Sequence, residues 1–566
     1  MGERKKKRKW LDNALVKAVQ STLEATVLAP TQDIVVATKA GRIQVRWDNA
    51  ANATAMGQLV FFAEFLDFAG VFERWIEHCP LNYTSGNASS VRDVLGTLML
   101  SILDGQHRYA HVAGLRGDGV APAILGMQKI ISDEALRRAL KAIAPAAHAK
   151  HDDDARQAQI HQLARAQNWM QDALFDSVQN AFDTPWILDC DPTVKPLYGQ
   201  QSGAEVGYNP KKPGRPSHTI HTYWISALRL VIGAELQSGK ANSARHSLPQ
   251  LDNILTKLLP RQRPKLVRAD CAFGNETLMC ALERLSQPYL FKLKQSANVK
   301  RLLAKQWRYG DWADLGQGWQ GREDTLMLMG WSQPRRVIVM RRQIRGDLIV
   351  ETSTKSRKGG AKTTAKTAAK AASPKRFEQQ SLTFINTFDA VKVYEHVVLV
   401  TNSSYDTQAI GQLYRDRADC ENGFDELKNQ WGWGGYCTQD IERCNITAQA
   451  VALVYNWWSW YCRLAHPQAR LEAITSRPLM LAAIGKVTEH AGQKKLLLTT
   501  THAAVAQVKA LVANVQAGLE LIRVTAPQLT QAARWRALVT FICSKINAAM
   551  MEKANRANAP PIIMAV

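Results

Sequence analysis

Residues 184–194, TPWILDCDPTV, decide the fold of this chain of 566 residues. The run has the composition of a β-strand, and it carries Asp189 and Asp191 two positions apart. Successive residues of a strand point to opposite faces, so the two aspartates share one face and Cys190 lies on the other. Unpaired carboxylates are costly in a core. The pair therefore indicates either a turn, since Asp-Pro favours turns, or a metal-binding strand end, which is the sharper hypothesis.

The sequence after this run alternates between strand and helix patterns as far as Lys294. Two strands are expected in HTYWISALRLVIGAELQSG, with a break near Ala227–Arg229, and a third in PKLVRADCAFG, ending at Asp270. Helices are expected in LPQLDNILTKLL and NETLMCALERLSQ, and a last strand in PYLFKLK. Three strands, helix, strand, helix and strand predict an α/β domain with a mixed sheet. Ligands usually bind at strand ends of such sheets, which makes Asp191 and Asp270 candidate site residues.

A charged stripe is predicted farther along the chain, in LYRDRADCENGFDELKNQWGW, residues 413–433. On one α-helix with about 100° per residue, Tyr414, Arg417, Glu421 and Lys428 fall on the same side. Most charged helical faces are solvated surfaces with (i, i+4) pairs. Here Arg417 precedes Glu421, the less favourable order, and Asp425 follows Glu421 as a like charge. From the stripe alone, an ordinary surface and a functional site remain equally open.

The composition bounds the class of protein. The formal net charge is +23 and the sequence pI about 9.7. Charge of this size, spread along the chain, indicates a large polyanionic partner, with nucleic acid first and an anionic membrane surface second. No signal peptide and no apolar run long enough for a membrane span stand out, so a cytoplasmic protein is expected. The nine cysteines show no zinc-ligand spacing and predict reduced thiols.

The remaining segments suggest five regions. A basic arm at 3–9 begins the N-terminal segment. Helical patterns dominate the next region, where Ser132 is expected to cap a helix. A β-rich region follows the α/β core. A low-complexity stretch with eight Lys or Arg and no acid predicts a disordered basic linker. The expected regions are an N-terminal segment at 1–56, helices for DNA binding at 57–180, a catalytic core at 181–298 and 401–440, a β-rich insertion at 299–400 with the linker at 355–376, and C-terminal helices at 441–566.

Three carboxylates from separate elements point to a chemistry. Asp191 (or Asp189), Asp270 and Glu421 supply hard oxygen ligands among many positive charges, which suits Mg²⁺ or Mn²⁺. Two such ions about 3.5–4 Å apart activate a nucleophile and stabilise a leaving oxygen in phosphoryl transfer. The loop at 198–218 adds Lys211, Lys212 and Arg215, which are expected to hold a phosphate backbone.

On these residues the chain resembles the DDE transposases of bacterial insertion sequences. The likeness is to the branch with a Tyr-Arg-Glu-Lys signature and a β-strand insertion before the Glu. Tyr414, Arg417, Glu421 and Lys428 match its gaps of two, three and six residues. Asp270 resembles the second Asp and leaves 150 residues before Glu421 for the insertion. The loop GYNPKKPGRPSH and the stretch LTTTHAAV also resemble this group, over roughly residues 57–505.

The resemblance implies a fold, an activity and roles for residues. It implies an RNase H-like catalytic core with a mixed sheet, interrupted by the β-rich insertion and flanked by helical regions, and two divalent metal ions. Such proteins cut DNA at transposon ends and join the freed end to target DNA, many of them as dimers that synapse two ends. Asp191, Asp270 and Glu421 would be catalytic metal ligands, with Asp191 favoured over Asp189 because Thr193 follows it. Tyr414, Arg417 and Lys428 would contact DNA in a protein that works on the bacterial nucleoid.

Two other functions fit the same residues. One is a DNA-binding protein that keeps an RNase H-like shell without catalysis, which would bind DNA in a salt-sensitive way and cut nothing. The other is a structure-specific nuclease on the same core, which would cut DNA without joining it. A strand-transfer assay separates the three.

Overall fold

The computed structural model describes residues 33–47, 52–83, 85–146, 153–241, 243–306, 310–344, 394–501 and 503–556. Three predicted features lie wholly or partly outside these residues: the basic arm at 3–9, the basic linker at 355–376 and the part of the β-rich insertion at 345–393.

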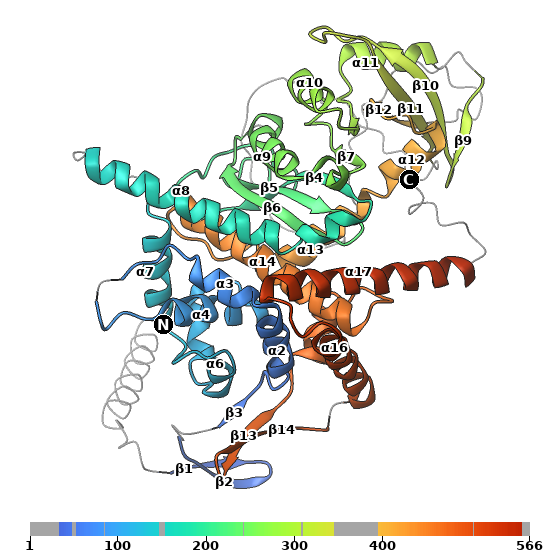
Figure 1. Ribbon diagram of the computed structural model, residues 1–566. Coiled ribbons are helices and arrows are strands. Elements are labelled where there is room, and N and C mark those ends of the chain that lie inside the picture. Colours follow the sequence, from blue (N-terminus) through green and yellow to red (C-terminus); the bar gives the residue numbers. More distant parts are fainter. Residues whose placement is uncertain are drawn as a thin grey trace, which may run out of the picture.

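A nine-stranded mixed sheet is the centre of the fold (Figure 1). Its order is β6-β5-β4-β7-β8-β12-β11-β10-β9. The strands are β4 (Ile187–Pro196), β5 (Ser217–Ile225), β6 (Leu230–Ser238), β7 (Leu266–Ala269), β8 (Tyr289–Lys292), β9 (Ala313–Gly316), β10 (Trp319–Leu326), β11 (Arg335–Gln343) and β12 (Tyr394–Thr401). β4 is parallel to β7, and β7 is parallel to β8, whereas all the other pairs are antiparallel.

The first five strands carry the predicted α/β core. With α9 (Ser243–Lys257) and α10 (Glu276–Arg284), the chain order is β4-β5-β6-α9-β7-α10-β8, as expected from the sequence. The break between β5 and β6 holds Arg229 at φ +49°. The fold class is thus confirmed: an α/β core with a large mixed sheet, a β-rich insertion and helical flanks.

The β-rich segment extends the same sheet. After α11 (Ala297–Gln306), β9, β10 and β11 form an antiparallel meander, and β12 lies between β11 and the core strand β8. β11 occupies the first half of the strand expected at 335–352; the described part ends at 344. The chain enters the insertion after β8 and returns as β12, which pairs with β8, so the insertion is joined to the core sheet at both ends. The helices of the predicted signature follow β12 directly.

The free edge of β6 is covered by amide side chains from α14 (Ile441–Ala465). Asn456 accepts from the N–H of Val231 at 3.0 Å and donates to its C=O at 2.7 Å. Asn445 accepts from the N–H of Leu236, and Gln449 donates to the C=O of Ala234. Residues 445, 449 and 456 lie on one face of a helix. They satisfy the backbone groups of an edge strand that would otherwise offer a pairing surface.

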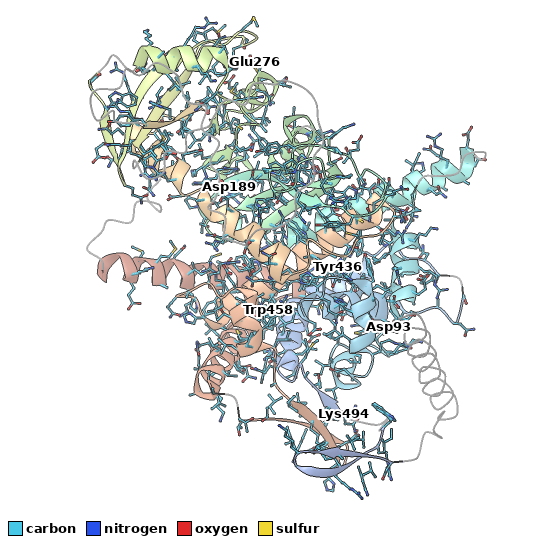
Figure 2. All side chains as sticks on the ribbon, turned by 180° about the vertical axis from the view of Figure 1, so that it is seen from behind. Asp93, Asp189, Glu276, Tyr436, Trp458 and Lys494 are labelled. Carbon is cyan, nitrogen blue, oxygen red and sulfur yellow. The ribbon has the colours of Figure 1, made fainter. Side chains whose placement is uncertain are left out.

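The helical regions pack around α14. The N-terminal helices are α2 (Leu59–Ala69), α3 (Val71–Glu77), α4 (Val91–Leu103), α5 (Val112–Leu115), α6 (Val120–Ile124), α7 (Asp133–Ile143) and α8 (Asp153–Asp176). Ser132 caps α7 as predicted, accepting from the N–H of Ala135. Trp75 stacks on Trp169 and meets the edge of Trp457, so aromatic rings join α3, α8 and α14. Trp457, Trp458 and Trp460 are buried in the core, and Figure 2 shows Trp458 near the middle of the molecule.

The C-terminal region departs from the prediction of helices alone. α15 (Ala473–Met480), α16 (Val505–Thr525) and α17 (Gln531–Arg556) are helical, but β13 (Gly485–His490) and β14 (Gln493–Leu498) form a hairpin that pairs with β3 (Ala53–Thr54). A second hairpin, β1 (Ile34–Thr38) with β2 (Gly41–Val45), precedes β3. Contrary to the expectation that no apolar run is long enough for a membrane span, α16 has the length and apolar composition of one. It packs against α14 and α17.

Candidate active site

Asp191 and Asp270 occupy neighbouring positions in the sheet. β4 and β7 are parallel, and their last pair is Cys190 with Ala269, so one further step along each strand reaches the two aspartates. Asp270 directly follows β7 as predicted, and its Oδ1 accepts from the N–H of Ala272 at 2.9 Å. Asp191 is not at a strand end: β4 continues to Pro196 because β5 pairs with it over its whole length. The Asp-Pro step therefore lies within a strand and not in a turn. Only the pairing with β7 stops just before Asp191.

Asp189 is a partner of Arg268 and not a free carboxylate. The two residues face each other in the β4–β7 register, and two hydrogen bonds of 2.7 Å join the guanidinium to both carboxylate oxygens. Both side chains are almost completely buried. Since this pair fills the carboxylate's acceptor sites, the geometry favours Asp191 as the first metal ligand. Sequence analysis missed Arg268, although its position two residues before Asp270 mirrors that of Asp189 before Asp191.

The predicted stripe lies on two helices and not on one. α12 (Thr407–Arg415) holds Tyr414, and α13 (Ala418–Gln430) holds Glu421 and Lys428. In an uninterrupted helix the N–H of Arg417 would bond the C=O of Leu413. Here that C=O accepts from the Arg268 guanidinium, and the N–H of Arg417 turns to the C=O of Tyr414 at 3.3 Å. Arg268 therefore interrupts the series of helical backbone hydrogen bonds between α12 and α13, shortly before Glu421.

α13 is pressed against the face of the sheet that bears the acids. A Cβ at Gly423 would lie 3.0 Å from the ring of Trp224 on β5, so the glycine allows the close approach. Phe424 meets the same ring edge-on. Trp224 pairs with Asp189 across the sheet, which places it on the face of the two aspartates. The packing brings Glu421 to the side of the sheet where Asp191 lies.

Arg417 joins the helix to Asp191. Its Nη2 lies 2.9 Å from Asp191 Oδ1, and both side chains are mostly shielded from solvent. Burial raises the pKa of Asp191 to about 7; the charge of Arg417 opposes this rise, and those of Asp270 and Glu421 add to it. The three acids are thus close enough to repel one another. A carboxylate that resists ionisation beside two others is typical of a functional site.

Lys428 and Lys211 form the positive side of the site. Burial lowers the pKa of Lys428 to about 8, the charge of Lys211 lowers it further, and the charges of Asp191 and Asp425 oppose this. Residues more than 200 positions apart are therefore neighbours. Tyr414 points elsewhere: it packs with Leu413 against the apolar cluster of the insertion strands, which includes Leu315 and Ile338.

The other two predicted cations lie on the loop between β4 and β5 and surround a tyrosine. Lys212 Nζ and the Arg215 guanidinium lie 5.0 and 4.9 Å from the ring centre of Tyr198. The hydroxyl of Tyr198 also accepts from Lys212, which lowers the pKa of the phenol. These cations share one surface of the loop but are held by the aromatic ring.

The donor set fits a divalent ion by its chemistry. Asp191, Asp270 and Glu421 supply only carboxylate oxygens, the ligands that Mg²⁺ and Mn²⁺ prefer. The Arg417 guanidinium, which pairs with Asp191, opposes the repulsion between these carboxylates. A bound metal cation would neutralise the same negative charge. Within the described ranges, no three His, Cys, Asp or Glu side chains are gathered closely enough to enclose an ion. The three acids would have to draw together on binding.

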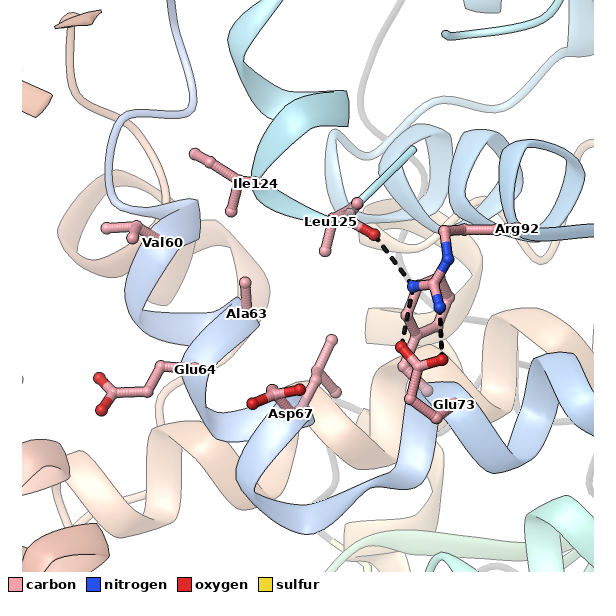
Figure 3. A pocket seen from close by; sticks show the side chains of 11 residues that line it. Val60, Ala63, Glu64, Asp67, Glu73, Arg92, Ile124 and Leu125 are labelled. Carbon is pink, nitrogen blue, oxygen red and sulfur yellow. Dashed lines mark hydrogen bonds and ion pairs between the residues drawn. The ribbon is translucent and has the colours of Figure 1, made fainter. Parts of the chain in front are cut away.

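A pocket elsewhere in the molecule is lined by none of the predicted site residues. It lies between α2, α3, α4 and α6, and Figure 3 shows Glu64, Asp67 and Glu73 at its wall. Arg92 pairs with Glu73 and also donates to the C=O of Leu125. The face of the sheet that bears Asp191 and Asp270 therefore remains the candidate active site.

Comparisons with known proteins identify a family for this chain. The family described as "Transposase DDE domain group 1" matches residues 42–519, which include every candidate site residue. No curated protein matches the chain. Among solved structures, the chain is similar to a piggyBac transposase in a synaptic complex with hairpin DNA, at 10% sequence identity and a TM-score of 0.38, covering 92% of this chain and 88% of that chain. That structural likeness is too low to carry an argument about function.

Proposed function

This chain belongs to the DDE transposase family, and from that premise we propose that it cleaves DNA at transposon ends and joins them to target DNA by divalent-metal-dependent phosphoryl transfer. The single observation that carries the proposal is the convergence of Asp191, Asp270 and Glu421 on one face of the sheet, beside Arg417 and Lys428. Burial raises the pKa of Asp191, and the charges of Asp270 and Glu421 add to this rise, so a bound cation would stabilise its charged form. A DNA strand needs the neighbouring positive charges.

The proposed roles follow from position. Asp191 and Asp270 on adjacent strands and Glu421 on α13 would hold Mg²⁺ or Mn²⁺, which would polarise the phosphodiester and activate the attacking oxygen. Arg417, now paired with Asp191, would be released to the phosphate backbone once the carboxylate has another partner. Lys428 and Lys211 would hold the strand next to the acids, and Lys212 and Arg215 would extend that contact along the loop. We also propose that two copies act together, each holding one transposon end.

A strand-transfer assay tests this function against its alternatives. The full chain is mixed with Mg²⁺, DNA carrying the inverted repeats that flank its gene, and a target plasmid. Joined products that vanish in EDTA are expected. Cutting without joining would favour a structure-specific nuclease, and salt-sensitive binding without cutting would favour a non-catalytic DNA-binding protein.

Metal binding should depend on pH with a definite sign. The pKa of Asp191 in the metal-free fold lies near 7, above that of an unfolded Asp near 3.9. The folded state therefore binds more protons than the unfolded state between these values, and this group's stabilisation is lost as the pH rises through 7. A metal ion replaces the lost proton. We expect Mn²⁺ to raise the melting temperature more at about pH 8 than at about pH 6. The added free energy of unfolding is up to about 2.7 kcal/mol when the Mn²⁺ concentration is about a hundred times Kd.

The control for this measurement is Asp191→Asn, which cannot ionise. Thermal melts of both proteins, with Mn²⁺ and with EDTA, should show a pH-dependent metal effect only in the wild type. An equal effect at both pH values, or one that survives in the variant, would contradict the role of Asp191 as a ligand.

A further inference from the structure

Tyr208 is an exposed aromatic residue on a fixed loop beside the candidate active site. Its side chain is 83% exposed, more than any other aromatic side chain in the described part of the chain. Within the same part, no hydrogen bond or ring contact engages it, whereas Tyr198 on the same loop is held by two cations. A large aromatic ring turned fully to water has no packing role in the fold.

The base of the loop is firmly attached to the core. The N–H of Ser217 donates to the C=O of Glu205 at 3.0 Å, and the N–H of Ser202 donates to the C=O of Gln439 at 2.8 Å. A Cβ at Gly207 would lie only 1.7 Å from the C=O oxygen of Gly239. The backbone next to Tyr208 thus packs directly on the chain that follows β6. The loop backbone therefore has a defined position, so binding would cost mainly the rotamer freedom of the one side chain.

The loop starts close to the candidate active site. It leaves β4 at Pro196, five residues beyond Asp191, which corresponds to about 17 Å along the strand. At 3.4 Å per base step this distance is about five nucleotides. Lys211, three residues after Tyr208, acts electrostatically on Lys428, on which Asp191 also acts. Lys211 thus adds a positive charge that lies near Tyr208 in the sequence and near Lys428 in the fold.

We propose that Tyr208 stacks on an unpaired base of the bound DNA, a few nucleotides from the phosphate that is cut. Aromatic side chains interleaved with cations bind single-stranded nucleic acid by stacking, largely independently of sequence. Bases inside a duplex have no free face, so the partner is an overhang, a frayed end or a flipped nucleotide. This inference rests on the proposed function and adds to it the form of DNA that the site receives.

The test is DNA binding by the full chain in EDTA, so that no cleavage is needed. Two probes share one sequence: a blunt duplex, and the same duplex with a single-stranded overhang that carries 2-aminopurine. Tyr208→Ala is expected to weaken binding of the overhang probe by about 5- to 100-fold and to leave the blunt duplex little changed. The wild type and Tyr208→Phe should alter the 2-aminopurine fluorescence on binding, and Tyr208→Ala should not.

The matched control is Val206→Ala, a change at another exposed apolar residue of the loop, which should behave as wild type. Three results would overturn the inference and leave the proposed function standing. Tyr208→Ala could lose equal affinity for both probes, or it could lose none for the overhang probe. Val206→Ala could also lose as much affinity as Tyr208→Ala. A wild type that binds neither probe at low salt would overturn both.

Discussion

Replacing Glu421 with Gln should abolish metal-dependent DNA cleavage, while replacing Asp425 with Asn should leave it close to wild type. Both residues are exposed acids on α13, one turn apart, but only Glu421 acts electrostatically on Asp191. The amide keeps the shape of the side chain and removes the charge that a metal ion needs. Losing about 4 kcal/mol of transition-state stabilisation lowers the rate by about 1,000-fold.

The measurement is the initial rate of strand cleavage with Mg²⁺ on DNA carrying the transposon end. Binding of the same DNA in EDTA serves as the check on folding, and it should be unchanged in both variants because neither acid holds phosphate. Cleavage by Glu421→Gln at the wild-type rate, or an equal loss in Asp425→Asn, would show that α13 does not supply a catalytic acid.

Replacing Arg268 with Met should be the most destabilising single change near the site. Asp189 and Arg268 are buried and joined by two hydrogen bonds of 2.7 Å, and Arg268 also donates to Ser226 Oγ at 2.6 Å. Removing the guanidinium leaves a buried carboxylate without its partner, which costs about 3–5 kcal/mol. Unfolding in urea should show this loss as a lower midpoint with an unchanged slope.

The double variant Asp189→Leu/Arg268→Met is the control for this prediction. With both charges gone, no unpaired charge remains in the core, so most of the lost stability should return. The double variant still lacks the donor to the C=O of Leu413, and cleavage should stay impaired if Arg268 positions α13. A double variant no more stable than the single one would contradict the account of the buried pair.

The sequence predicted the core well because its signals are local. Alternating strand and helix patterns between residues 184 and 294 correspond to β4, β5, β6, α9, β7, α10 and β8 in the right order. Asp191 and Asp270 were predicted to lie at strand ends, and the parallel pairing of β4 with β7, which was not predicted, brings them next to each other. The Ser132 cap of α7 was equally predictable, since an N-cap depends on residues within one turn.

The features that the sequence did not predict depend on distant contacts. The break between α12 and α13 arises because Arg268, 145 positions before Leu413, takes a backbone carbonyl. No local pattern in residues 413–433 contains that information. The same holds for Asp189: its spacing from Asp191 left it as the alternative first ligand, and the register of β4 with β7 assigns it to Arg268. The hairpin of β13 and β14 was missed because its short strands pair with β3, more than 400 residues earlier.

We propose that Asp191, Asp270 and Glu421 together bind the divalent metal ion that drives cleavage. A change in the metal preference of one ligand tests this binding. Thiolate is a poor ligand for Mg²⁺ and a better one for softer ions such as Mn²⁺. Cleavage by Asp270→Cys should therefore be absent with Mg²⁺ and return with Mn²⁺, while the wild type cuts with both. Cleavage by Asp270→Cys at the wild-type rate with Mg²⁺ would contradict the claim.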